Sequence, residues 1–183
     1  MWHGNIGIRE LFRKVKFIPQ YCQFNRITEA GEPTQGGREM NKVIFNKNLC
    51  VACHSCEVSC SIIHSSEKSL ISAILEGIRP RLQIVYTTGD KTGGITIEQC
   101  KHCKRAKCIE AYPQGALFYD EEGRVVCSEE KCTGCGLCEK ACPFHAIRVI
   151  DRCVKCDLCK DVSDFPVCVT SCPVGALTVK EVQ

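Results

Sequence analysis

The chain has 183 residues, a formal net charge of +3 and 18 cysteines. Aromatic residues make up only 7% and do not alternate with basic ones, which argues against a stacking platform for single-stranded nucleic acid. A short secreted disulfide scaffold can be this rich in cysteine, but here most cysteines fall in triplets spaced too tightly for pairing within a triplet. No apolar run reaches the roughly 18 residues of a membrane span, and neither a secretory signal nor a twin-arginine pair stands near the N-terminus. We therefore expect a protein of the reducing cytoplasm.

Residues 1–39 are predicted to form a basic N-terminal extension and connector. Residues 7–18 place apolar side chains at helical spacing and basic ones elsewhere around the turn. Residues 29–38 are rich in glycine and predict a flexible connector. Such a basic amphipathic segment can contact a membrane surface or a partner protein. Alternatively, it is an upstream extension, because Met40 would also make a natural start; Cys22 is expected to be a plain thiol.

From residue 42 onward, short strands, cysteine-rich loops and short helices are expected to alternate. A strand is predicted over residues 43–45, before the first cysteine set, which comprises Cys50, Cys53, Cys56 and Cys60. A short helix follows over residues 57–63. Residues 82–86 and 95–97 bracket several glycines, which favours a hairpin or an insertion at this point.

The second cysteine set comprises Cys100, Cys103 and Cys108, and Tyr112 stands where the spacing would place a fourth cysteine. A hairpin is predicted from residues 116–119 and 124–126. The third set comprises Cys132, Cys135, Cys138 and Cys142, and the last comprises Cys153, Cys156, Cys159, Cys168 and Cys172. Further strands are predicted over residues 147–150 and 176–179. The segments that follow Pro113, Pro143 and Pro173 are similar to one another, which indicates an internal repeat.

The run from Cys132 to Pro143 reads CTGCGLCEKACP, the spacing with which bacterial ferredoxins hold iron–sulfur clusters. Three closely spaced thiolates curl around one cluster, whereas the fourth points to a different one. The sequence therefore predicts an α+β protein, with a duplicated bacterial ferredoxin-like fold of short strands and helices around four iron–sulfur clusters, mostly [4Fe-4S]. We expect this domain to span residues 40–183, with one half formed by residues 40–72 and 146–183 and the other by residues 95–145. The clusters must supply much of the folding free energy, because continuous apolar sequence is scarce.

The crossed spacing assigns cofactor ligands to the four clusters. The first is expected to take Cys50, Cys53, Cys56 and Cys172. The second takes Cys60 and Cys168 with two members of the triplet Cys153, Cys156 and Cys159. Both Cys153 with Cys156 and Cys156 with Cys159 have the required spacing of two intervening residues. The third takes Cys100, Cys103, Cys108 and Cys142. The fourth takes Cys132, Cys135 and Cys138 with whatever stands at position 112.

Tyr112 makes the fourth cluster unusual. A phenol has a pKa near 10 and is a poor ligand for sulfide-bridged iron. The site is therefore expected to hold either a cubane with another fourth ligand or a [3Fe-4S] cluster; the substitutes are Cys127, Cys153 or a solvent oxygen. A third interpretation is that Tyr112 packs and this cluster is absent. The histidines in or beside the sets replace no missing cysteine, so they are expected to donate hydrogen bonds or face solvent.

On these motifs, the chain over roughly residues 40–182 resembles the four-cluster ferredoxin-like electron-transfer subunits of multisubunit oxidoreductases. Within that group, residues 49–60 with His64 and Ser65, the Cys100-Lys-His-Cys103 set and the Lys155-Cys-Asp-Leu-Cys159 run are most similar to the iron–sulfur subunit of nickel carbon monoxide dehydrogenase. The resemblance implies that Cys156 and Cys159 are the ligands from the C-terminal triplet and that Cys153 is spare. Tyr112 and residues 1–39 depart from the group's pattern.

The resemblance implies a non-catalytic subunit of an anaerobic oxidoreductase complex. It would pass electrons between a catalytic partner, foremost carbon monoxide dehydrogenase, and an acceptor such as a hydrogenase or flavoprotein. Alternative partners are a hydrogenase or a molybdopterin or tungstopterin enzyme acting on formate or aldehydes. No nucleotide loop, triad order or paired-carboxylate motif stands in the sequence, so no catalytic residue is assigned. The opposing hypothesis is a zinc-binding structural module, although zinc sites usually combine two spaced pairs of cysteines rather than triplets. A third hypothesis is a catalytic component that reduces a small molecule at the cluster near Tyr112.

Overall fold

The computed structural model describes residues 40–87, 94–111 and 115–182. All of them belong to one compact unit, Gly37–Gln183. The predictions made for the amphipathic segment, Cys22 and Tyr112 lie outside the described residues, and the domain boundary after residue 39 stays a prediction.

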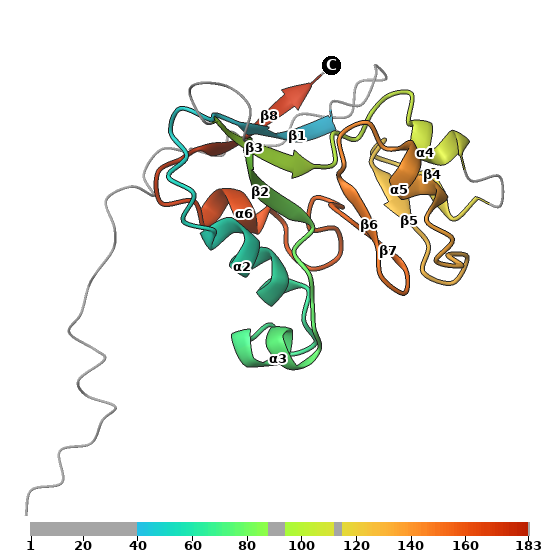
Figure 1. Ribbon diagram of the computed structural model, residues 1–183, viewed down its shortest axis with the longest axis horizontal. Coiled ribbons are helices and arrows are strands. Elements are labelled where there is room, and N and C mark those ends of the chain that lie inside the picture. Colours follow the sequence, from blue (N-terminus) through green and yellow to red (C-terminus); the bar gives the residue numbers. More distant parts are fainter. Residues whose placement is uncertain (1–39, 88–93, 112–114, 183) are drawn as a thin grey trace, which may run out of the picture. The chain divides into compact units, whose positions relative to one another are not determined.

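The described residues form short strands and helices in close alternation (Figure 1). The strands are β1 (Met40–Phe45), β2 (Leu82–Thr87), β3 (Gly94–Gln99), β4 (Leu117–Tyr119), β5 (Val125–Cys127), β6 (Ile147–Val149), β7 (Cys153–Lys155) and β8 (Leu177–Val182). The helices are α2 (Ser55–Ile63), α3 (Leu70–Leu75), α4 (Lys107–Glu110), α5 (Leu137–Ala141) and α6 (Val167–Thr170). All the strands predicted from residue 43 onward and the helix predicted over residues 57–63 are confirmed, whereas α3, α4, α5, α6 and β7 have no counterpart by residue range among the predicted elements.

The strands of the described part of the chain pair as antiparallel ribbons: β1 with β8, β2 with β3, β4 with β5, and β6 with β7. In the β1–β8 ribbon, Val43 lies opposite Val179 and Phe45 opposite Leu177. This ribbon joins the two ends of the unit, so it brings the first and last cysteine sets together.

The helices that carry cysteines also pack in pairs. α2 contacts α6, and α4 contacts α5. Two separate apolar cores accompany these pairs. The first contains Val43, Leu82, Ile84, Ile97, Leu158 and Leu177, together with four buried cysteines. The second contains Ala106, Leu117, Val125 and Ile147, together with Cys108 and Cys138. This combination of paired helices and short ribbons is an α+β, ferredoxin-like architecture.

The division into two halves stays a prediction. Ile147 and Val149, which it groups with the first and last cysteine sets, pack in the second core, because β6 contacts α5 and pairs with β7, whose Cys153 lies in the same core.

Helix α3 lies outside both cores. Ser69 is its N-cap, and the Ser69 hydroxyl accepts a hydrogen bond from the backbone N–H of Ser72 at 3.1 Å. The side chains of Ile71, Ile74 and Leu75 on this helix are exposed.

Among the described residues, no helix is both long and apolar enough to cross a membrane.

Candidate metal centres

The loops between neighbouring cysteines curl through left-handed backbone conformations. Ala52, His54, His102, Gly134 and Gly136 all have positive φ angles, between 45° and 74°. For the residues other than glycine this conformation costs on the order of 1 kcal/mol or more each, and such strain is concentrated at functional sites. At Gly134 only glycine fits, because an added Cβ would lie 2.5 Å from the carbonyl oxygen of Asp151. The strained loops turn successive cysteines toward a common side.

The first sulfur group combines the first cysteine set with a residue from the other end of the chain. Burial, the charge of Glu57 and the neighbouring Cys172 raise the pKa of the Cys56 thiol to about 11. Cys50 and Cys172 both pack against the first core. Cys53 lies exposed on its loop, with its sulfur 3.4 Å from the hydroxyl oxygen of Ser55.

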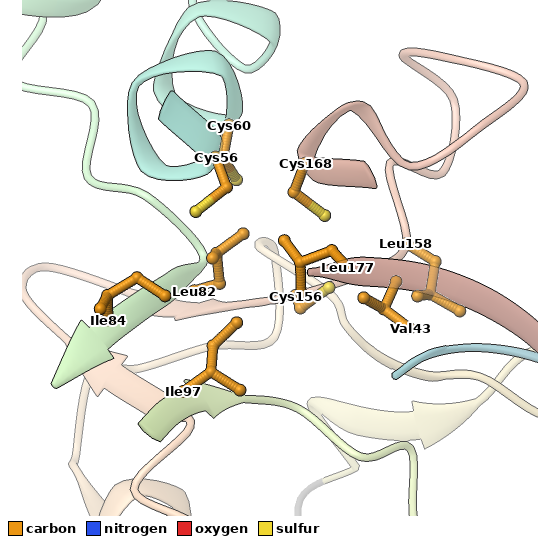
Figure 2. Close-up of a cluster of buried hydrophobic side chains, with 10 residues drawn as sticks. All are labelled: Val43, Cys56, Cys60, Leu82, Ile84, Ile97, Cys156, Leu158, Cys168 and Leu177. Atoms are coloured by element: carbon orange, nitrogen blue, oxygen red, sulfur yellow. The ribbon is translucent and has the colours of Figure 1, made fainter. Parts of the chain in front are cut away.

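The second sulfur group lies between α2 and α6. Figure 2 shows Cys60 on α2 and Cys168 on α6 pointing into the space between the helices, with Cys156 below them. Burial raises the pKa of Cys60 to about 12, and the nearby Cys156 and Cys159 add to that shift. Burial, followed by the charges of Cys156 and Cys60, also raises the pKa of Cys168. The two members of the C-terminal triplet that share this space are thus Cys156 and Cys159.

The third sulfur group joins the second cysteine set to the last cysteine of the third set. Burial raises the pKa of Cys103 and, to about 11, that of Cys108. Cys100 and Cys142 stand near both of these thiols and raise their pKa values further. Cys142 therefore lies with the second set, as crossed ligation requires.

The fourth sulfur group contains five cysteines rather than four. Cys132, Cys135 and Cys138 line one small cavity, and Cys127 and Cys153 line it with them. The neighbouring Cys127 and Cys138 thiols raise the pKa of Cys153, so these three thiols lie close together. Tyr112, the residue expected at the fourth position, lies outside the described part of the chain.

Backbone amides donate hydrogen bonds to at least one sulfur in every group. The donor and acceptor pairs are Ala52 N to Cys50 Sγ at 3.4 Å, Arg81 N to Cys60 Sγ at 3.3 Å, His102 N to Cys100 Sγ at 3.5 Å, Cys153 N to Cys132 Sγ at 3.3 Å and Ala176 N to Cys172 Sγ at 3.2 Å. The Gln99 side chain donates to Cys156 Sγ at 3.5 Å. Donors of this kind stabilise a thiolate and raise the reduction potential of iron bound to it.

A buried lysine stands among three of the sulfur groups. Lys155 is only 4% exposed. Its ammonium group donates to the carbonyl oxygens of Val125 and, at 2.7 Å, Cys156. Its positive charge lowers the pKa values of Cys108, Cys127 and Cys156, against the larger effect of burial in two of them. In the sequence, Lys155 is visible only as part of the Lys155-Cys-Asp-Leu-Cys159 run, which gives no sign that its ammonium group is buried.

Two histidines, His64 and His102, lie against the cysteine loops and form hydrogen bonds there; that neither replaces a cysteine ligand stays a prediction. His64 Nδ1 donates to the Cys60 carbonyl oxygen at 2.7 Å, and its Nε2 lies 3.5 Å from Asp157 Oδ1. Burial raises the pKa of Asp157, but His64 and Arg81 outweigh it and hold that pKa at about 2. Arg81 also forms an ion pair with Asp157.

His102 is 1% exposed and neutral. Burial and then the charge of Lys155 lower its pKa to about 3. Its Nδ1 accepts the backbone N–H of Val125 at 3.1 Å, so the proton is on Nε2, which has no partner within the described protein. A buried N–H donor without a protein acceptor, between Cys100 and Cys103, suits an acceptor supplied by a bound group.

These donor sets fit iron–sulfur clusters. Within the described ranges, no three His, Cys, Asp or Glu side chains converge closely enough for a single metal ion. A multi-iron core needs its thiolates set apart around it. The buried thiols other than Cys138 have raised pKa values, and binding to iron is what deprotonates such thiols. Cys138 is the exception, because the neighbouring Cys153 thiol lowers its pKa. Sulfurs that share a buried space and receive amide hydrogen bonds therefore suit clusters well.

Comparisons with known proteins agree with this chemistry. Residues 93–182 match a family model described as a 4Fe-4S dicluster domain. The chain is 31% identical to the electron transport protein HydN of Escherichia coli strain K12, covering 75% of this chain and 87% of that protein. It is 33% identical to an iron–sulfur protein of Rhodospirillum rubrum, covering 78% and 84%. It is 28% identical to the thiosulfate reductase electron transfer subunit PhsB of Salmonella typhi, covering 74% and 72%.

Proposed function

We propose, from the premise that this chain belongs to the ferredoxin-like family of iron–sulfur electron-transport proteins, that it conducts electrons through four clusters between a catalytic oxidoreductase subunit and a second acceptor. It is itself a non-catalytic electron-transfer subunit. The single observation that carries the proposal is the gathering of the cysteines into four sulfur groups, each of which combines residues from distant parts of the chain.

The sulfur groups follow one another as a row. Cys56 of the first group raises the pKa of Cys168 of the second, so these groups are neighbours. Cys100 of the third group does the same to Cys156 of the second. The third and fourth groups share the second core, through Cys108 and Cys138. When bound, iron–sulfur clusters supply one-electron carriers at each of these positions.

The ends of the row are its most accessible points. Among the described cysteines, only Cys53 of the first group and Cys135 of the fourth are exposed. All the others are buried or half-buried. The chain therefore shields the middle of the row from water and opens it at both ends, which suits one entry point and one exit point for electrons.

The paired helices support the proposed duplication. The helices that carry cysteines form two similar pairs. Helix α2, with Cys56 and Cys60, packs against α6, and helix α4, with Cys108, packs against α5. In both pairs, a cysteine at the end of one motif joins the sulfur group of the other. Two ferredoxin-like units, one inserted within the other, account for the crossed ligation of the clusters and for the similar segments that follow Pro113, Pro143 and Pro173.

The proposed partner is a carbon monoxide dehydrogenase, on the motif resemblance over residues 49–60, 100–103 and 155–159. The alternatives are a formate or aldehyde oxidoreductase with a pterin cofactor, or a hydrogenase. PhsB, by its name, serves a thiosulfate reductase, which supports a catalytic partner subunit of some kind. Because thiolate-held clusters are sensitive to oxidation, we propose a reducing cytoplasm as the location.

The test is anaerobic co-purification from the native host, followed by addition of carbon monoxide, formate or hydrogen to the complex. We expect one of these substrates to bleach the visible absorption of the clusters in this subunit. Cys103→Ala is the informative variant, because it removes a thiolate from the third group and leaves the exposed ends intact. Full bleaching of both end clusters in that variant, at the wild-type rate, would contradict conduction along the row.

A further inference from the structure

We propose that Cys153 supplies the fourth thiolate of the cluster held by Cys132, Cys135 and Cys138. This inference rests on the proposed function, since it requires an iron–sulfur cluster at that site. It makes the fourth group a complete four-thiolate site although position 112 is a tyrosine.

The cavity at this site is lined by five sulfurs and by little else that could bind iron. Its volume, including its open mouth, is about 250 Å³. The other lining residues are Ala116, Leu117, Thr133, Gly134, Gly136 and Val149. Among these described residues only thiols are soft ligands for iron, so the fourth ligand is sought between Cys127 and Cys153.

Cys153 and Cys127 both lie beside the motif cysteines, and their polar contacts distinguish them. The Cys153 backbone N–H donates to Cys132 Sγ at 3.3 Å, and the neighbouring Cys127 and Cys138 thiols raise the pKa of Cys153. Cys127 also has two motif cysteines as neighbours, because Cys153 and then Cys132 lower its pKa and Cys127 in turn raises that of Cys138. The Cys127 sulfur, however, lies 3.8 Å from the carbonyl oxygen of Ser128, which accepts its thiol proton, so this thiol has a polar partner outside the sulfur group.

Cys153 is also free of any other ligand role. The remaining members of its triplet, Cys156 and Cys159, lie with Cys60 and Cys168 in the second sulfur group. In the binding step, the Cys153 thiol releases its proton to solvent and its sulfur forms one bond to the fourth iron. No other thiolate is displaced and no electron is transferred.

The test compares anaerobically reconstituted wild-type protein with three variants by electron paramagnetic resonance and iron analysis. Cys153→Ala is expected to gain the signal of an oxidised three-iron cluster and to lose about one iron per molecule. Cys127→Ala is the matched control, because it removes a sulfur from the same cavity by the same substitution. It and Tyr112→Phe are expected to keep the wild-type spectrum and iron count.

The inference is overturned if wild-type protein already gives the three-iron signal, or if Cys127→Ala or Tyr112→Phe produces it while Cys153→Ala does not. Cys153→Ser guards against failure of the alanine variant to fold, because serine nearly preserves the volume; it is expected to alter the signals of this cluster alone. The two proposals fail separately. Protein without iron would refute the proposed function, whereas protein with three intact cubanes and a three-iron fourth cluster would refute only the role of Cys153.

Discussion

At the scale of single residues, Lys155 places a buried positive charge among the sulfur groups. A buried ammonium among sulfur groups offsets the negative charge of thiolate-bound iron, and it favours the reduced cluster most because that state carries one more negative charge. Surface lysines have little such effect, because solvent screens them.

We predict that Lys155→Met lowers the midpoint potential of the clusters in the second and third groups. The substitution keeps most of the side-chain volume and removes the charge. Lys180→Met, which removes an exposed charge on β8, serves as the control and should leave the potentials close to those of the wild type. The measurement is a redox titration followed by electron paramagnetic resonance. Equal shifts in the two variants would show that burial gives Lys155 no special influence.

Gly134 tests the fit of a cysteine loop. Gly134→Ala should destabilise the fourth cluster, because its Cβ would meet the Asp151 carbonyl oxygen at 2.5 Å and its φ is +69°. Gly136→Ala is the matched control, with φ +74° and no atom within 4 Å of the added Cβ. Both variants carry the left-handed penalty of about 1 kcal/mol, so only the clash differs. The rate of cluster loss to an iron chelator should rise more in Gly134→Ala; equal rates would refute the steric argument.

Among the elements, every strand except β7 was predicted from the sequence, whereas α2 was the one described helix given a predicted range. Leu82 and Ile84 alternate with less buried neighbours along β2, a pattern that sequence shows directly. α3 has apolar residues that face solvent, such as Leu75, so it lacks the amphipathic signal of a packed helix. β7 is too short for a periodic pattern, and its pairing with β6 depends on a turn between cysteine sets.

The β1–β8 ribbon should be essential for the first core. Leu177 on β8 is 2% exposed and packs with Val43 and Leu82. Leu177→Ala should cost about 2–5 kcal/mol of stability through lost burial and a cavity. Leu75→Ala on α3 removes an equal volume from a side chain that is 82% exposed and should change stability by less than about 0.5 kcal/mol. Denaturant-induced cluster loss, followed by absorbance, compares them; similar midpoints would contradict the described core.

At the scale of the whole molecule, the crossing of sulfur groups is the organising feature. Cysteine spacing alone predicted which sets combine, because the fourth cysteine of each motif points away from the first three. Spacing could not decide among Cys153, Cys156 and Cys159, since the triplet satisfies it in two ways. Nor could it reveal Lys155 or Gln99 beside the sulfurs, because the contacts of Lys155 with Val125 and of Gln99 with Cys156 arise only from the packing of distant segments.

Crossed ligation gives a direct prediction. Cys142→Ala should damage the cluster of Cys100, Cys103 and Cys108, and should leave that of Cys132, Cys135 and Cys138 in place, although Cys142 is closer to the latter in sequence. Variable-field Mössbauer spectra and iron counts of the variant distinguish the two sites. Selective loss of the cluster within the CTGCGLCEKACP run would show that the pairing is reversed.

The central claim is that the chain folds around four iron–sulfur clusters in a row. Its most direct test is the content of iron, acid-labile sulfide and zinc in full-length protein purified without oxygen. We expect a brown protein with about sixteen irons and as many sulfides, four of each for every cubane; about fifteen irons would leave the row intact with a three-iron fourth cluster. A colourless protein with stoichiometric zinc and no labile sulfide would refute the four-cluster structure.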